Sequence, residues 1–81
     1  MAQVTYFVVQ SFQAGHRGAL VPDAPMMLQS ADAALRRAQS AALSRAGVVA
    51  FSRTGDPTTG DFEDAKVLYA HGQLPADAEA I

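Results

Sequence analysis

The segment VTYFVVQSFQ, from Val4 to Gln13, constrains the fold of this chain more than any other feature. It is rich in β-branched and aromatic residues, which predicts a β-strand that ends at the turn-prone sequence AGHRG. Its large apolar residues divide between the two faces of such a strand, with Tyr6, Val8 and Phe12 on one and Phe7 and Val9 on the other. Because both faces are apolar, we expect a central strand that is covered on both sides.

A second segment, from Ala31 to Ala46, has the pattern of an amphipathic helix. Ser30 precedes it as an N-cap, and Gly47 follows where a left-handed residue commonly ends a helix. The apolar stripe consists of Ala31, Leu35, Ala38, Ala42 and Ala46, flanked by Ala34 and Leu43. Since most of these side chains are methyl groups, the helix can approach a sheet closely, and large side chains of the sheet must fill the layer between.

Three further segments are predicted as strands. Pro22 and Pro25 interrupt the first of them, so that Met26 to Gln29 is its better paired part and the strand belongs at an edge. The other two run from Val48 to Arg53 and from Ala65 to His71. The order β-β-α-β-β then predicts a small α+β fold, an antiparallel sheet in the order 2-1-3-4 with one helix on one face.

One helix leaves the second face of this sheet without a cover from the same chain, and exposed apolar patches of that kind usually mark interfaces. We expect the interface to be made by these residues: Tyr6, Val8, Phe12, Phe51 and Tyr69. A two-fold homodimer is the commonest assembly that would cover such a face. The sequence therefore predicts a non-catalytic interaction module that acts by self-association or by binding another protein.

The length of 81 residues allows a single domain, which we expect to span residues 1–74, with residues 75–81 as a loosely packed tail. A domain this small is only marginally stable. There is no cysteine to form disulfides, so reinforcement must come from tight packing or from a partner subunit.

Charge and hydropathy argue against several other partners. The net charge of −2, from 6 basic and 8 acidic residues, is not the basic balance of a nucleic-acid binder. No apolar stretch approaches the roughly 18 residues of a membrane span. The start MAQVTYFVVQ lacks the basic region and cleavage site of a signal peptide, so we expect a cytoplasmic protein.

The loop from Thr54 to Asp64 is acidic, which raises the question of a calcium site. Asp56 is followed by Pro57 and two threonines, however, so the alternating acids of an EF-hand are missing. The dipeptides of Gly with Asp, together with the proline, are typical of turns. We expect a hairpin turn here, with no metal.

A second candidate site consists of His16, Arg17 and His71, which could bind a small anionic ligand where two parallel strands end at one edge of the sheet. Solvated strand ends explain the same residues more simply. Arg53 should lie at the opposite edge, and the helix residues Arg36, Arg37 and Arg45 fit a solvated face. No nucleophile motif or phosphate-binding loop is present, so neither an enzyme nor a cofactor is predicted.

The segment from Ala46 to Pro75 resembles short uncharacterised bacterial proteins, a domain of unknown function with an A-F-S-R strand, Gly/Asp turns and a strand ending in H-G-x-x-P. The matching residues are Ala50 to Arg53, Gly55, Asp56, Gly60, Asp61, His71, Gly72 and Pro75. The resemblance implies the same helix–strand–turn–strand arrangement. It implies no activity, substrate or catalytic residue.

Overall fold

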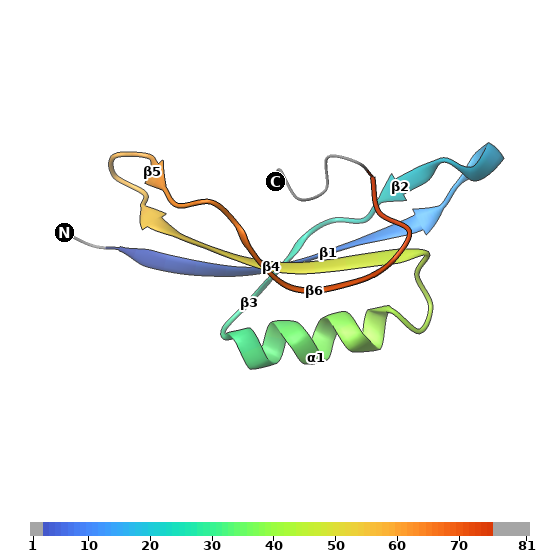
Figure 1. The fold of residues 1–81 in the computed structure, drawn as a ribbon, viewed down its shortest axis with the longest axis horizontal. Coiled ribbons are helices and arrows are strands. Elements are labelled where there is room, and N and C mark those ends of the chain that lie inside the picture. Colours follow the sequence, from blue (N-terminus) through green and yellow to red (C-terminus); the bar gives the residue numbers. More distant parts are fainter. Residues whose placement is uncertain (1–2, 76–81) are drawn as a thin grey trace.

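The computed structural model describes residues 3–75, which form one α-helix on an antiparallel sheet of six strands (Figure 1). The strands are β1 (Val4–Ala14), β2 (Leu20–Pro22), β3 (Met26–Leu28), β4 (Gly47–Asp56), β5 (Asp61–Phe62) and β6 (Lys66–Gly72). The helix α1 spans Ala31–Ala41, and the short turn η1 spans His16–Gly18. The predicted α+β class with a small antiparallel sheet is confirmed.

The long strands β1 and β4 form the centre of the sheet and pair from Val4 opposite Gly55 to Phe12 opposite Gly47. The two short strands β2 and β3 pair with β1, and β5 and β6 pair with β4, all antiparallel. This is the predicted order, and the strand beside β1 is broken in two, as the prolines predict. The short strand β5 was not predicted, since it lies in the segment expected to be a hairpin loop. Pro22 and Pro25 bracket the break between β2 and β3, because proline lacks the N–H that a ladder needs.

The helix α1 begins as predicted, since the N–H of Ala33 donates to the Ser30 hydroxyl at 3.1 Å. It ends at Ala41, however, and the prediction that it continues to Ala46 is wrong. The N–H of Ala46 donates to the carbonyl of Phe12 at 2.9 Å, so the chain must leave the helix early to reach the sheet. Leu43 lies in this connection and is 89% exposed, not beside the buried stripe.

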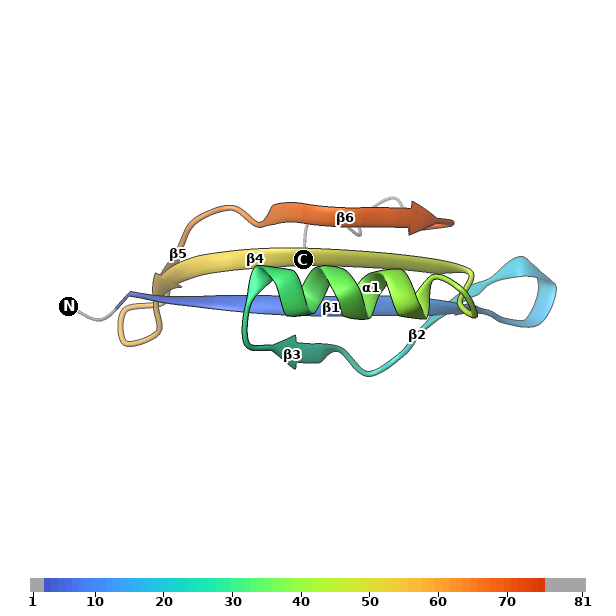
Figure 2. The same ribbon diagram turned by 90° about the horizontal axis from the view of Figure 1, so that it is seen from below.

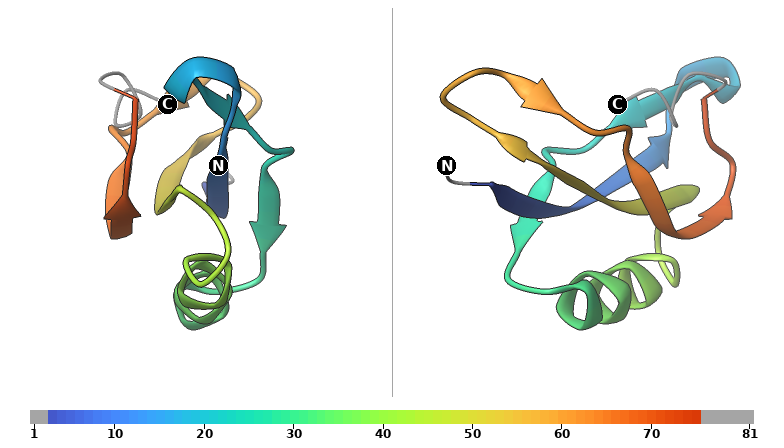
Figure 3. Two further views of the ribbon diagram at one scale, coloured as in Figure 1. Left: turned by 90° about the vertical axis from the view of Figure 1, so that its right-hand side faces the viewer. Right: turned by 60° about the vertical axis from the view of Figure 1, so that its left-hand side comes forward.

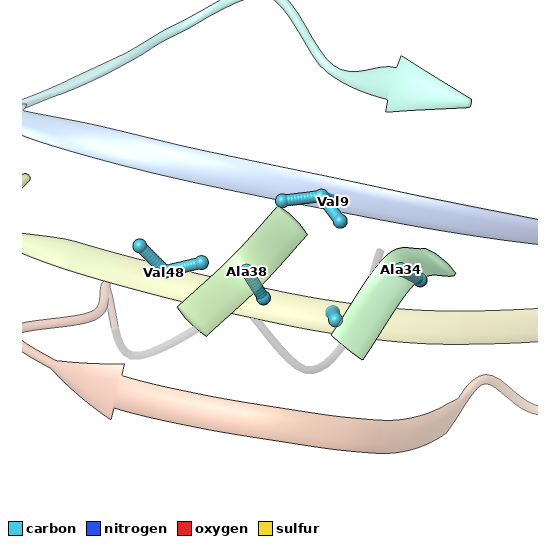
Figure 4. Packing of buried hydrophobic residues seen from close by; sticks show 5 residues of the cluster. Val9, Ala34, Ala38 and Val48 are labelled. Carbon is cyan, nitrogen blue, oxygen red and sulfur yellow. The ribbon is translucent and has the colours of Figure 1, made fainter. Parts of the chain in front are cut away.

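The core lies between α1 and the central strands. Its buried residues are Val9, Ala34, Ala38, Val48 and Ala50 (Figure 4). The helix contributes two alanines, and the strands contribute two valines and an alanine. The large side chains expected to fill this layer lie around the cluster and are only partly buried, among them Phe7, Leu28 and Leu68. Seen from below, α1 runs along β1 and β4 (Figure 2).

The helix covers the face of β1 that carries Phe7 and Val9, which pack in this core. The opposite face, called here the open face, carries Tyr6, Val8 and Phe12. The sheet is curled, and α1 lies on one side of it alone (Figure 3). The prediction of a loosely packed tail falls mainly on residues 76–81, which lie outside the described residues.

Candidate interaction surface

The open face holds an apolar groove of about 420 Å³, called here the open-face groove. Its lining residues come from four strands and one connection: Tyr6, Val8, Gln10, Pro25, Met27, Phe51, Arg53 and Phe62. Those described lining residues include no carboxylate, imidazole or aliphatic hydroxyl. The groove therefore offers a binding surface with one cation, Arg53, at its rim.

Strand alternation and register place these side chains together. Val8 pairs with Phe51 on one side and with Met27 on the other, so the three side chains lie side by side on the open face. Tyr6, two residues from Val8 on the same face of β1, pairs with Arg53. Phe51 is 4% exposed and lies at the bottom of the open-face groove, whereas Met27 is 60% exposed and lies at one side of it.

The bank opposite Met27 is formed by Phe62 of β5. The Tyr6 and Phe62 rings stack with centroids 6.0 Å apart, and the Arg53 guanidinium lies 5.6 Å from the Phe62 ring centroid. Arg53 also donates from Nε and Nη2 to the Glu63 carbonyl, both at 3.3 Å. These contacts hold the aromatic wall in place without any bound molecule.

The other end of the open face is covered by the chain itself. After β6 the chain turns to the side of the sheet opposite α1 (Figure 1). A Cβ on Gly47 would collide with the Gln73 carbonyl and would lie 3.2 Å from Leu74 Cδ2. Gln73 and Leu74, called here the strap, thus cross the sheet at Gly47. This glycine has no positive φ, so the predicted left-handed helix end is wrong and close approach explains the residue.

The predicted interface residues divide among three places. Tyr6, Val8 and Phe51 line the open-face groove. Phe12 also lies on the open face, but opposite Gly47 at the strap end, where it is 5% exposed. Tyr69 lies on the other face, packed against the core under α1, so its expected place on the uncovered face is wrong.

The position of Tyr69 follows from a β-bulge. Ala50 pairs with Tyr69, whereas its neighbour Phe51 pairs with Val67, so Leu68 is an extra residue in β6. Leu68 and Tyr69 then both contact the helix side. Such an insertion changes the parity of a strand, and strand alternation alone does not reveal it.

The candidate anion site is not assembled. β1 and β6 do run parallel, but His71 pairs with Val48 and is therefore level with Ser11. His16 lies beyond the end of β1 at Ala14, whereas His71 is level with Ser11 two strands away, so the two histidines do not meet at one edge. His71 stacks instead on Tyr69, with ring centroids 6.3 Å apart.

Arg17 has a structural role at the tip of the β1–β2 hairpin. Its φ of 58° and the φ of 79° at Gly18 are both left-handed, and the Ala19 N–H donates to the His16 carbonyl at 3.2 Å. Two positive φ angles are the requirement of a type I′ hairpin turn. The histidine and arginine of this segment therefore belong to a tight turn.

The acidic loop is a hairpin turn between β4 and β5, as predicted. Asp56 Oδ1 accepts from the N–H of Thr58 at 2.9 Å and from its hydroxyl at 2.6 Å. These hydrogen bonds from Thr58 hold the pKa of Asp56 below its usual value of 3.8. The carboxylate is occupied by its own turn, and within the described part of the chain no three acidic or histidine side chains converge as metal ligands would.

Asp23 is the residue whose importance the sequence did not reveal. Its Oδ2 accepts from the Ser11 hydroxyl at 2.6 Å and its Oδ1 accepts from the Gln13 amide at 2.6 Å. Arg45 Nε lies 3.2 Å from Oδ2. The bonds from Ser11 and Gln13, with the charge of Arg45, hold the pKa of Asp23 below its usual 3.8. In the sequence, this aspartate is distinguished only by its position between Pro22 and Pro25.

The three arginines that were predicted on the helix do not form one cluster, and Arg45 lies beyond the end of α1. Arg45 pairs with Asp23, and Arg37 donates from Nε to the Met26 sulfur at 3.3 Å. Arg36 is exposed. Arg53 lies at the opposite end of the sheet from His71, as the topology predicts.

No protein-family model, curated protein or solved structure matches this chain. The resemblance drawn from the A-F-S-R and H-G-x-x-P residues therefore stays a prediction, and function must be argued from the geometry. Among residues 3–75, no helix has both the length and the apolar character needed to cross a membrane.

Proposed function

We propose that this protein is a non-catalytic interaction module that forms a homodimer through the open-face groove. The observation that supports it is the groove itself, an apolar hollow of about 420 Å³ lined by aromatic and aliphatic side chains. Aromatic residues and methionine with one arginine are the composition that protein interfaces favour. We assign this role to a bacterial protein, as the resemblance implies, and we propose the cytoplasm as its setting.

The face of the sheet is a better interface than either edge. The outer edge of β6 carries Lys66, the chain's single lysine, and the bulge at Leu68 distorts its pairing groups. The opposite edge is broken between β2 and β3 by Pro22 and Pro25. Lysine, bulges and prolines are the features by which natural sheets avoid edge-to-edge pairing.

The face is also large enough. The molecule has principal extents of 46, 23 and 17 Å. The sheet lies along the longest and shortest of these extents, because α1 is stacked below it along the intermediate one (Figures 1 and 2). A standard interface buries about 800 Å² on each partner, which is close to the area of this whole face. A closed two-fold dimer covers the groove of both copies, so neither open face is left free to add a further copy.

Light scattering behind a sizing column, from low micromolar to near millimolar protein, tests the dimer. We expect a mass that rises to that of two chains. Met27→Asp should abolish the rise, because it places a charge on the bank of the groove. Leu43→Asp is the matched control, since Leu43 is also exposed but lies on the connection after α1. A wild-type monomer at every concentration would overturn the proposed function.

A further inference from the structure

We infer that a polar pocket on the helix side of the sheet, called here the arginine pocket, binds the phosphate group of a small molecule. The pocket holds about 360 Å³ and lies where the second half of α1 faces the connection between β2 and β3 (Figure 2). Its polar lining residues are Ser11, Asp23, Arg37, Ser40, Ser44 and Arg45. The open-face groove lies on the other side of the sheet, so this inference does not depend on the proposed dimer.

Asp23 fixes one side of the arginine pocket. Its carboxylate accepts from the Ser11 hydroxyl and the Gln13 amide, both at 2.6 Å, and its backbone N–H donates to the Ser11 carbonyl at 2.9 Å. Arg45 Nε lies 3.2 Å from Asp23 Oδ2. Within residues 3–75 Asp23 is the one polar partner of the Arg45 side chain. The acid therefore positions this guanidinium at the pocket and leaves it donors for a ligand.

Arg37 supplies the second guanidinium. Its Nε donates to the Met26 sulfur at 3.3 Å, and a thioether is a weak acceptor. In the part of the chain that the structure describes, Arg37 forms no ion pair with a carboxylate. The pocket thus places two guanidiniums against one carboxylate, so its formal charge is +1 and it favours an anion.

Two serines make a phosphate group the best match among anions. Ser40 and Ser44 line the pocket, and neither hydroxyl has a hydrogen-bond partner among residues 3–75. Two guanidinium groups and two hydroxyls offer more donors than the about four lone-pair sites of a carboxylate can accept. A phosphate group presents three strong acceptor oxygens to its surroundings, which suits donors that converge from two sides.

The end of α1 would oppose an anion, since the last turn of a helix carries partial negative charge. Its carbonyls are already engaged, however. Those of Ala38, Ser40 and Ala41 accept backbone hydrogen bonds of between 2.9 and 3.2 Å. Charge-assisted hydrogen bonds from two arginines outweigh the remaining effect.

An NMR titration of ¹⁵N-labelled protein with inorganic phosphate, at constant ionic strength, tests the site. We expect saturable shifts of the Arg37 and Arg45 Nε–H signals and of the amides of residues 40–45. Glycerol 3-phosphate distinguishes the source of the phosphate group, because tighter binding would identify a phosphomonoester as the ligand and equal or weaker binding the free ion. Equal binding of acetate would overturn the choice of phosphate. No saturable shift up to about 50 mM phosphate, which covers a weak millimolar site, would overturn the site itself.

Variants separate a built site from general attraction by charge. Arg37→Gln should weaken phosphate binding by about tenfold, because it removes one charged donor group. Arg37→Lys should recover part of the affinity, since it keeps the charge without the planar fork. Arg36→Gln is the matched control, because it removes the same charge from the neighbouring residue, which lies outside the pocket lining. Equal losses with Arg36→Gln and Arg37→Gln would overturn the site.

The outcome is independent of the dimer test. Met27→Asp changes the open-face groove, so this variant should bind phosphate as the wild type does. A monomer that binds phosphate would overturn the proposed function and support the arginine pocket.

Discussion

The two ends of the open face are completed in different ways. At the strap end the chain closes on itself, because the Ala46 N–H donates to Phe12 and the Gln73 N–H donates to Ala46, both at 2.9 Å. At the groove end the contacts are between side chains, chiefly the stacking of Tyr6 on Phe62. The same pair of central strands thus presents one end covered by its own backbone and one end that stays open in the monomer and that the proposed dimer would cover.

This difference separates stability from association. Backbone hydrogen bonds and close glycine contacts form in every folded monomer, so the strap end should contribute to the free energy of unfolding whether or not a dimer forms. Tyr6 and Phe62 at the groove end are only partly buried in the monomer, and they should contribute most when a second surface covers them. Variants at the two ends should therefore change different measured quantities.

The largest expected effect is that of Gly47→Ala at the strap end. The added methyl group collides with the Gln73 carbonyl, which is backbone and can move only if the strap lifts. We expect this contact to lower the free energy of unfolding by about 3 kcal/mol. Urea denaturation measures the change.

Gly60→Ala is the control for Gly47→Ala. Gly60 has a φ of 79° and nothing within 4 Å of an added Cβ, so only backbone strain remains. We expect that strain to cost about 1 kcal/mol. If Gly47→Ala cost no more than Gly60→Ala, the strap would not be held against the sheet.

The next effect distinguishes the two ends directly. Leu74→Ala removes a half-buried side chain from the strap and should lower the free energy of unfolding by about 1.5 kcal/mol with the dimer constant unchanged. Phe62→Ala should lower the unfolding free energy by about 1 kcal/mol but weaken the dimer by about tenfold. Urea unfolding of dilute protein and sedimentation equilibrium measure the two quantities. If both variants changed both quantities in the same proportion, the two ends would not differ in role.

Acidification should affect both ends, through two separate carboxylates. The folded pKa of Asp23 lies below its usual 3.8, first because Ser11 donates to it, and that of Asp56 is lowered by Thr58. The unfolded chain then binds more protons, so the stabilisation is fully present above the unfolded pKa and is lost as pH falls through the folded values.

Thermal unfolding between pH 7 and about pH 2.5 measures this loss. Asp23→Asn should lower the thermal midpoint at pH 7 by a few degrees, because the amide cannot replace the carboxylate toward Ser11, Gln13 and Arg45. It should also reduce the further fall of the midpoint at acid pH. Asp56→Asn should remove the remaining fall of the thermal midpoint at acid pH. If the midpoint of each single variant fell at acid pH as far as that of the wild type, these roles would be contradicted.

The parts of the fold that depend on local pattern could be predicted from the sequence. The alternation from Tyr6 to Phe12 assigns the two faces of β1, and Pro22 and Pro25 identify a broken edge strand, because both rules act within a few residues. Ser30 marks the helix start for the same reason. Tyr6, Val8 and Phe51, which the sequence predicts on the uncovered face, lie there and line the groove.

The remaining features depend on contacts between distant segments. Gly47 is required by Gln73, and the end of α1 is decided by a hydrogen bond from Ala46 to Phe12. The extra residue Leu68 reverses the parity of β6, which moved Tyr69 off the predicted face. No spacing in the sequence encodes these pairings, because each depends on register across the sheet.

The smallest expected effect lies at the tip of the β1–β2 hairpin, beyond the strap end. Arg17 adopts φ 58° and ψ 33° at a turn position that favours asparagine or glycine. Arg17→Asn should therefore raise the free energy of unfolding by about 0.5 kcal/mol, since asparagine tolerates the left-handed region better. The β-branched Arg17→Val should lower it by about 1 kcal/mol. Urea unfolding measures both, and neither variant should alter the dimer constant, because the turn lies away from the groove. A gain in stability with Arg17→Val would show that φ at this tip is not what limits the hairpin.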